Sequence, residues 1–477
     1  MSYEKYATNS GNQNADEQPA VKLRILLLGW NIGSGSTGVF IDELARYLSG
    51  RGHVVTCLSA GRCDWRVRPH LHVAQTQPYE LIELRNPPVM FGARPDDPRV
   101  HVDSAKTGAL LRSVLSARQP HVAAIIDYPG WPASTVEVCQ REGSKVLVYL
   151  QNFWPVCTRL SLYSRWKEVC YDYRDGEKCV ACMADVTGSS AARWRNRLPS
   201  ALWGIEKFRF MMKKVYQGIV STRSSSSAIT AGAGYAIRRR AYVDGINKAD
   251  LLVAISGGSL KTAEIFGVSG KTVRELPVRF LSQAHLRQSR DQRATRTGEG
   301  GPLNFAYLGA VVPEKGVEIL VSAFRGIPAS CARLDIYGTV SSDYKKYLES
   351  LSDLENPPVF HGRYDRRGLG PLLRNVHLGI VPSNCEDTLP STVTEFHALG
   401  IPVIGSQIGG IPNQIDDGKN GLLFKPGDVE SLGAVMRHVI GTPEVLAAWR
   451  DNLPSSFEPE CCWLEFERYC IELSSTT

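Results

Sequence analysis

Apolar segments of strand length alternate with amphipathic helical segments along most of this chain, and this alternation limits the folds that the chain can adopt. The first strand, Leu23–Leu28, is almost continuously apolar, and a helical pattern over Val39–Leu48 follows it. Strands without a polar face are typical of parallel sheets that helices cover on both sides. A second series of the same kind starts at Leu303. The pattern predicts an α/β protein with two Rossmann-like domains. The predicted strands are His53–Leu58, Tyr79–Leu84, Val122–Asp127, Lys145–Leu150 and Ala249–Ser256, then Leu303–Gly309, Leu334–Tyr337, Val359–His361, Leu378–Val381 and Ile401–Ile404.

Domain limits follow from length and from local composition. A chain of 477 residues is too long for one ordinary core, so two domains are expected. We predict a disordered, polar tail over residues 1–20, a first domain over 21–281 with an insertion at 155–245, a linker at 282–301, a second domain over 302–455, and a C-terminal helical piece at 456–477 that crosses back to the first domain. The tail lacks the apolar core of a signal peptide, and no apolar run approaches the ~20 residues of a membrane span. The expected location is therefore the cytoplasm.

The net charge of +7 is concentrated in one segment. Residues 191–240 hold eleven Lys or Arg and one acid, a local charge of +10, which leaves −3 for the remainder. Aromatic residues are interleaved with the basic ones over 193–220, which is typical of a helix at the inner, anionic face of a membrane. The preferred interpretation is a helix packed on its own domain. No recognition motif accompanies the charge, so nucleic-acid binding is not expected. The Ala- and Gly-rich run that ends at Arg238–Arg240 is predicted to be a flexible loop.

Four of the twelve cysteines lie in the insertion, at Cys157, Cys170, Cys179 and Cys182. Four thiolates can close a tetrahedral zinc site, and the last two form a Cys-x-x-Cys pair. The gap between the first two is not that of a standard zinc finger. A structural zinc site is one interpretation, and reduced thiols or a redox pair are the others.

The stretch from Val381 to Gly400 carries the most chemistry. A strand end, a proline-containing loop and a helix that Gly400 terminates follow one another. The N–H groups of Ser391, Thr392 and Val393 would lie at the helix N-terminus, where an anion is favoured. The carboxylates of Glu386, Asp387 and Glu395 lie before and after them. This arrangement suits a diphosphate flanked by hydroxyl groups, as in a nucleotide sugar. The first glycine loop, residues 29–38, lacks the usual GxGxxG spacing, and NAD or FAD binding is only weakly supported.

Four segments together resemble the GT-B retaining glycosyltransferases of family 4, the "glycosyltransferases group 1" set. The segment Tyr307–Val317 is similar to the family's Gly-Arg-x-x-x-x-Lys-Gly segment, and Asp387–Glu395 is similar to its E-x7-E motif, here in the form Asp-x-Leu-Pro-x-Thr-Val-x-Glu. The helix and strand over Glu395–Ile404 follow the family pattern. Ile408–Pro412 and Asp417–Phe424 look like the GG loop and the closing Gly-x-Leu-Phe. The resemblance implies a GT-B fold, in which two Rossmann-like domains face a central cleft.

The resemblance also implies roles for individual residues. Glu395 would accept hydrogen bonds from the donor ribose, Asp387 with Glu386 would contact the transferred sugar, and Lys315 would neutralise the leaving diphosphate. The N–H groups of residues 391–393, together with Gly38, Gly409 and Gly410, would complete donor binding. The implied reaction moves a sugar from a nucleoside-diphosphate (NDP) donor to a hydroxyl acceptor with retention of configuration. The acceptor would be a glycan, a glycolipid or a small natural product, and the chemistry would need no metal or other cofactor.

Two departures from the family pattern affect catalysis. Ala310 stands where the family commonly has arginine, so a phosphate contact is missing unless Arg363 or another basic group supplies it. Gln151 stands where many members have histidine, and glutamine cannot hold a proton or a positive charge. The alternative function is therefore a catalytically weakened GT-B protein that acts as a partner or membrane-docked subunit. A sugar-nucleotide epimerase is disfavoured because the motif follows the transferase pattern.

Overall fold

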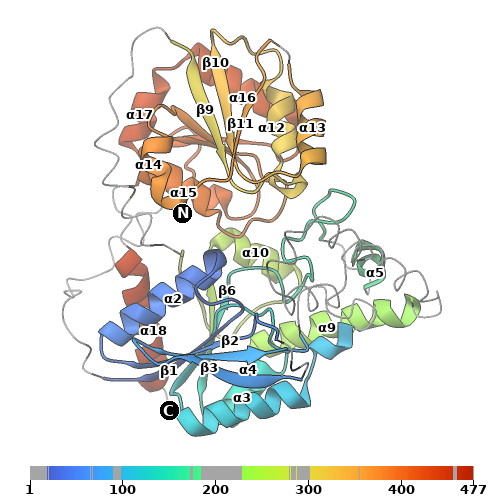
Figure 1. The fold of residues 1–477 in the computed structure, drawn as a ribbon, viewed down its shortest axis with the longest axis vertical. Helices are drawn as coiled ribbons and strands as arrows, with labels where there is room; N and C mark the ends of the chain where they lie inside the picture. The colour runs from blue at the N-terminus through green and yellow to red at the C-terminus, as the bar shows by residue number, and fades with distance from the viewer. Residues whose placement is uncertain are drawn as a thin grey trace.

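The protein consists of two parallel-sheet domains, as the sequence predicts (Figure 1). The computed structural model describes residues 21–64, 68–89, 98–171, 176–183, 228–278, 301–353, 355–454 and 459–475, and a few single residues between these ranges. The predicted tail, the linker at 282–301 and the basic segment at 193–220 lie almost wholly outside the described residues. In the described part of the chain, no helix is long and apolar enough to cross a membrane.

The first domain contains an eight-stranded sheet with the order β3-β4-β2-β1-β5-β6-β7-β8. Strand β3 runs antiparallel to β4, and the other neighbours are parallel. Strand β3 was not predicted from the sequence, because it is a short edge strand with a largely exposed pattern. The strands are β1 Arg24–Gly29, β2 Val54–Ser59, β3 His70–Gln75, β4 Glu80–Arg85, β5 Val122–Ile125, β6 Lys145–Leu150, β7 Leu251–Ala254 and β8 Val273–Glu275. The helices are α2 Gly35–Gly50, α3 Ala105–Arg118, α4 Thr135–Arg141, α5 Glu177–Met183, α9 Ala228–Lys248, α10 Gly257–Ile265 and α18 Pro459–Ser475, with a 3-10 turn η1 at Pro98–His101.

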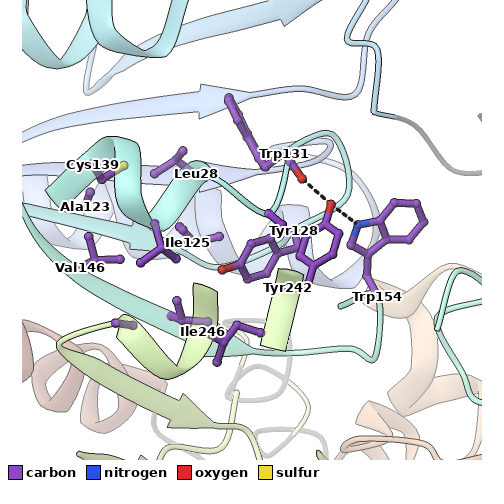
Figure 2. Close-up of a cluster of buried hydrophobic side chains, with 14 of the residues drawn as sticks. Leu28, Ala123, Ile125, Tyr128, Trp131, Cys139, Val146, Trp154, Tyr242 and Ile246 are labelled. Carbon is purple, nitrogen blue, oxygen red and sulfur yellow. Dashed lines mark hydrogen bonds between the residues drawn. The ribbon is translucent and has the colours of Figure 1, made fainter. Parts of the chain in front are cut away.

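Alternate residues of each buried strand face two different cores. In β1, Leu26 and Leu28 pack into the core beneath α3, α4 and α9, and Ile25 and Leu27 pack into the core beneath α2 and α18. Figure 2 shows the first of these cores, where the hydroxyl of Tyr242 on α9 donates to the Trp131 carbonyl (2.7 Å) and accepts from Trp154 Nε1 (3.3 Å). Side chains on both faces explain why the strands read as continuous apolar runs.

Helix α9 corrects one prediction. The loop predicted to end at Arg238–Arg240 is wrong, because these arginines lie in the middle of the helix. The small residues of its first half allow close packing: a Cβ at Gly234 would lie 3.0 Å from Pro98 Cγ. The side chains of Arg238 and Arg239 then donate to the backbone carbonyls of residues 154–156. Tertiary contacts therefore override the weak helix propensity of glycine here.

The second domain contains a six-stranded parallel sheet with the order β11-β10-β9-β12-β13-β14. Its strands are β9 Leu303–Leu308, β10 Ala332–Tyr337, β11 Val359–Gly362, β12 Leu378–Val381, β13 Val403–Ser406 and β14 Gly421–Phe424. Its helices are α12 Val317–Phe324, α13 Ser342–Leu351, α14 Leu369–Leu372, α15 Ser391–Ala398, α16 Val429–Gly441 and α17 Val445–Asp451, with 3-10 turns η4 Pro313–Lys315, η5 Arg366–Gly368 and η6 Ile411–Asn413. The strand order reverses between β9 and β12, and ligands of such sheets bind beyond the carboxyl ends of the strands at this point.

The C-terminal helix α18 belongs to the first domain in space. It contacts α2, β5 and β6, and Figure 1 shows it in red beside α2 in the lower half of the molecule. Glu467 anchors it, with its carboxylate 2.6 Å from His53 Nε2 and 2.8 Å from Arg51 Nε. The aromatic face formed by Trp463, Phe466 and Tyr469 is buried in the second core of that domain.

Candidate functional site

The loops that follow β9 and β12 meet at the reversal point of the second sheet. Gly316 permits this meeting: its φ is +68°, and a Cβ there would lie 1.8 Å from the Pro382 carbonyl oxygen. Asn384 N–H donates to the Glu314 carbonyl (2.9 Å) and joins the two loops. The two loops thereby bring Lys315 and Asp387 together, although 72 residues separate them in the chain.

Lys315 and Asp387 form an ion pair at this point. The Ser383 hydroxyl also lies 3.4 Å from Asp387 Oδ2. Both side chains keep some exposure, 33% for Lys315 and 17% for Asp387, so a ligand can reach them. Burial alone would lower the pKa of Lys315, but Asp387 and Cys385 outweigh it and raise that pKa above its usual value. The lysine is therefore a permanent, partly exposed cation at the reversal point of the second sheet.

The N-terminus of α15 is open to an anion. Its N-cap is Pro390, which provides no side-chain hydrogen bond to the first turn. The N–H of Val393 donates to the Pro390 carbonyl (3.2 Å). The N–H groups of Ser391 and Thr392 are therefore better candidates for ligand binding than the N–H of Val393. Unsatisfied N–H groups and the helix dipole favour a negatively charged group at such a position.

Glu395 is buried on the second turn of α15, with 1% of its surface exposed. Its Oε1 lies 3.3 Å from Arg366 Nε, and its Oε2 has no hydrogen-bond partner in the part of the chain that the structure describes. Burial raises the pKa of Glu395 to about 7, although Arg366 and Ser391 act in the opposite direction. A buried carboxylate oxygen without a partner is costly, and a ligand hydroxyl would satisfy it.

Arg366 is a site residue that the sequence analysis did not single out. Its Nη2 donates to the Ser391 hydroxyl (3.2 Å), so the guanidinium lies beside the N-terminus of α15. The basic run Arg363-Tyr364-Asp365-Arg366-Arg367 was a signal for it. Arg363 is exposed, and no contact joins it to the site among the described residues.

The glycine pair of the GG loop packs against the backbone of residues 387 and 388. A Cβ at Gly409 would lie 2.3 Å from the Asp387 carbonyl oxygen, and one at Gly410 would lie 2.0 Å from that of Thr388. Gly410 N–H donates to the Asp387 carbonyl (2.7 Å). These glycines support the loop, and a larger residue at either position would displace it.

The first domain contributes polar groups at the carboxyl ends of β5 and β6. The backbone carbonyl of Gln151 accepts a hydrogen bond from the Thr388 hydroxyl (2.8 Å). The side-chain Nε2 of Gln151 is buried and has no partner among the described residues. Asn152 Nδ2 donates to Asp127 Oδ1 (2.7 Å), and burial raises the pKa of Asp127 to about 7. Asp127 was predicted only as the end of a strand. Through the Gln151 carbonyl, this end of the sheet contacts the loop of Asp387 directly.

Two predicted donor-binding residues have other contacts. Gly38 lies inside the first turns of α2, where a Cβ would be 1.9 Å from the Asn31 carbonyl oxygen, so its contact is with its own loop. The glycines with positive φ in this loop are Gly33 and Gly35. Glu386 is buried and accepts hydrogen bonds from Tyr171 and Thr262 of the first domain.

The four insertion cysteines line one cavity, together with Arg238 and Arg239 of α9. Arg239 Nη2 lies 3.5 Å from Cys179 Sγ, and all four cysteines are free thiols. Among the described residues, however, no three His, Cys, Asp or Glu side chains are arranged to hold a metal ion. The thiols suit zinc chemically, but their arrangement does not form a ligand set.

Comparison with known structures defines the fold as GT-B. A sucrose-phosphate synthase from Thermosynechococcus elongatus superposes with a TM-score of 0.61 at 14% identity, over 96% of this chain and all of that chain. Anabaena HepE in complex with UDP gives a TM-score of 0.59 at 14% identity, over 94% of this chain and all of that one. At these identities the likeness concerns the fold alone.

The match to a known sequence family lies within the second domain. Residues 302–441 match the family described as "Glycosyl transferases group 1". The sulfoquinovosyl transferase SQD2 of Arabidopsis thaliana is 34% identical over 137 residues, which are 28% of this chain and 26% of that protein. A glycogen synthase of Mycobacterium tuberculosis is 28% identical over 173 residues, 35% of this chain and 41% of that protein. The chain thus matches between about a quarter and two fifths of the length of these relatives.

Proposed function

We propose that this protein is a retaining glycosyltransferase that moves a sugar from an NDP-sugar to a hydroxyl acceptor. Three features at the reversal point of the second sheet carry the proposal. They are the Lys315–Asp387 ion pair, the N-terminus of α15 without a side-chain cap, and the buried Oε2 of Glu395, which has no partner among the described residues. A cation and free N–H groups suit the diphosphate, and a buried carboxylate suits the ribose hydroxyls. HepE has been crystallised with UDP and with UDP-glucose, which supports a nucleotide-sugar donor here.

In this mechanism each group of the chain has one task. Lys315 and Arg366 offset the charge that builds on the leaving diphosphate, and Arg366 takes the place of the arginine missing at Ala310. Asp387 orients hydroxyls of the transferred sugar. The acceptor binds on the first-domain side, near Gln151, Asn152 and Asp127. The residues of the chain need no metal or other cofactor for these tasks.

A direct test is donor binding by thermal shift with UDP-, GDP- and dTDP-sugars, since a ligand of the native state raises its apparent stability. We expect one nucleotide class to raise the unfolding temperature of the wild type. The increase should be lost in Glu395→Ala, and transfer or donor hydrolysis should be lost in both Glu395→Ala and Asp387→Ala. Lys425→Met, an exposed lysine of the same domain, is the control. An unchanged response in Glu395→Ala would contradict the assignment.

Donor affinity is expected to increase as pH rises through about 7. The pKa of Glu395 is raised to about 7 by burial, and only the ionised carboxylate accepts hydrogen bonds at both oxygens. Below that pH, affinity should fall by up to about tenfold per pH unit. The same shift lowers the stability of the ligand-free chain as pH rises from about 4.3, the ordinary glutamate value, to about 7. Calorimetric titration with the sugar nucleotide at several pH values measures the donor affinity, because the diesterified phosphates of the donor do not titrate in this range.

Two variants make the pH test specific. Glu395→Gln should remove the pH dependence of donor affinity. Arg366→Met should move its midpoint upward, because Arg366 lowers the pKa of Glu395. Asp127→Asn should keep the dependence, although burial also raises the pKa of Asp127 to about 7. A pH dependence that survives in Glu395→Gln would assign it to another group.

A second candidate function rests on Gln151. Its amide Nε2 is buried without a partner and cannot carry charge, which favours a GT-B protein that binds a donor without turnover and serves as a partner or membrane-docked subunit. Donor binding with no transfer to any acceptor would support it. The basic segment 193–220, which we propose for docking at an anionic membrane face, lies outside the described residues. The zinc content of the purified chain, with and without Cys179 and Cys182, decides the metal prediction.

A further inference from the structure

The loop Cys385–Pro390, here called the donor loop, has side chains directed to both domains. Asp387 pairs with Lys315 of its own domain. The residues on either side of it, Glu386 and Thr388, bind groups of the first domain. Asp387 thus lies between two residues that the first domain holds, so the position of Asp387 depends on the contacts of its two neighbours.

Among the described residues, the hydrogen-bond partners of the Glu386 carboxylate are hydroxyl groups of the first domain. Its Oε1 accepts from Tyr171, and its Oε2 accepts from Thr262 Oγ1 on α10 (3.0 Å). Only 5% of the surface of Glu386 is exposed. A buried carboxylate needs such charge-assisted hydrogen bonds, and both would be lost if the domains separated.

Thr388 adds two more contacts between the domains. Its hydroxyl donates to the Gln151 carbonyl (2.8 Å), and its own carbonyl accepts from the hydroxyl of Ser256, the N-cap of α10 (2.6 Å). Further along α10, Gly258 N–H donates to Asn413 Oδ1 (2.9 Å). The first turn of α10 therefore supports the donor loop by direct contact.

Tyr171 reaches the donor loop from the insertion. Tyr163 and Val169 form an antiparallel bridge, and Cys170 N–H donates to the Leu162 carbonyl (2.7 Å), so residues 162–170 make a short hairpin. At its tip, Lys167 Nζ lies 3.3 Å from Glu318 of the second domain. The insertion thus contacts the second domain at Glu386 and at Glu318.

We propose that Tyr171 and Thr262 are positioning residues, which hold the domains closed and aim Asp387 at the donor sugar through Glu386. This inference rests on the proposed function for its kinetic consequence. Closure would form the two hydrogen bonds to Glu386, and the loop would then present Asp387 and Lys315 in one arrangement. Opening of the two domains would break both hydrogen bonds and leave Asp387 without a fixed position.

The kinetic test uses Tyr171→Phe, Thr262→Val and the double variant. We expect kcat to fall about tenfold in each single variant, which corresponds to one hydrogen bond to a charged group, and further in the double variant. Donor KM and the unfolding temperature should stay near the wild-type values. Tyr47→Phe, which removes a hydroxyl from the ring that packs on Trp463 of α18, is the matched control. A kcat equal to that of Tyr47→Phe, or a loss that follows unfolding, would overturn the proposal.

The second measurement does not depend on activity. Small-angle X-ray scattering of Tyr171→Phe/Thr262→Val should give a larger radius of gyration than the wild type, because the domains open. An unchanged radius of gyration overturns the closure. If the wild type transfers no sugar but the double variant opens, the proposed function fails and the contact between the domains stands.

Discussion

Replacement of Lys315 by methionine is expected to lower kcat by about 10²–10³-fold, with a smaller effect on donor affinity. Removal of a single preorganised electrostatic group at a reacting centre has effects of about this size. Lys315 is paired with Asp387, which the loop before α15 carries, so we propose that its charge acts where the diphosphate would leave. Steady-state kinetics and donor calorimetry measure the two effects separately.

The variant also leaves Asp387 without its cation, and a double variant separates the two causes. If Lys315 served only to neutralise Asp387, adding Lys315→Met to Asp387→Asn would cost no further activity. If Lys315 acts on the diphosphate, Lys315→Met/Asp387→Asn should be clearly less active than Asp387→Asn alone. Equal activity of the double variant and Asp387→Asn would contradict the mechanism proposed here. Lys425→Met should remain close to wild type, because its lysine is exposed.

Replacement of Arg238 by methionine is expected to destabilise the first domain by roughly 3 kcal/mol, since it leaves several buried acceptors without a donor. Arg238 is 1% exposed and donates to the carbonyls of Trp154 (2.7 Å) and Pro155 (3.1 Å) and to His101 Nδ1 (3.1 Å). Its guanidinium also lies 4.5 Å from the Tyr242 ring centroid. The unfolding temperature of that domain should fall by roughly 6–12 °C.

Arg240→Met provides the control, because it removes an exposed arginine from the same helix. Urea unfolding followed by tryptophan fluorescence compares the two variants. Equal stability would show that the carbonyl groups at the base of the insertion do not depend on Arg238. An intermediate result in Arg238→Lys is expected, since lysine keeps the charge but cannot donate to three acceptors in one plane.

Most of the fold could be predicted from the sequence, because the signals are local. Buried parallel strands such as Leu303–Leu308 are continuous apolar runs with helices between them, and they appear close to the predicted positions. The failures involve contacts distant in sequence. Strand β3 forms because it pairs with β4. Helix α9 forms because Gly234 packs on η1 and its arginines donate to the carbonyls of Pro155 and Val156. Neither element is therefore marked by a pattern within a short stretch of the sequence.

The candidate site likewise has residues that the sequence predicted and residues that only the folded chain brings together. Asp387 and Glu395 belong to one motif, and the resemblance linked them to Lys315, which the structure places against Asp387. Sequence patterns gave no reason to pair Arg366 with Glu395, or Tyr171 with Glu386, because the loops that carry these partners meet only in the folded chain. The contacts of Glu386 also show that adjacent carboxylates in a motif can face different domains.

Helix α18 has a consequence for the order in which the protein is made. The core formed by α2 and one face of the first sheet includes Trp463, Phe466 and Tyr469, so the first domain combines residues from both ends of the described chain. During synthesis, the apolar side chains beneath α18 stay uncovered until the whole second domain has left the ribosome. Domains that follow one another on a chain can fold in sequence, but here the second domain can complete its sheet before the first domain is closed.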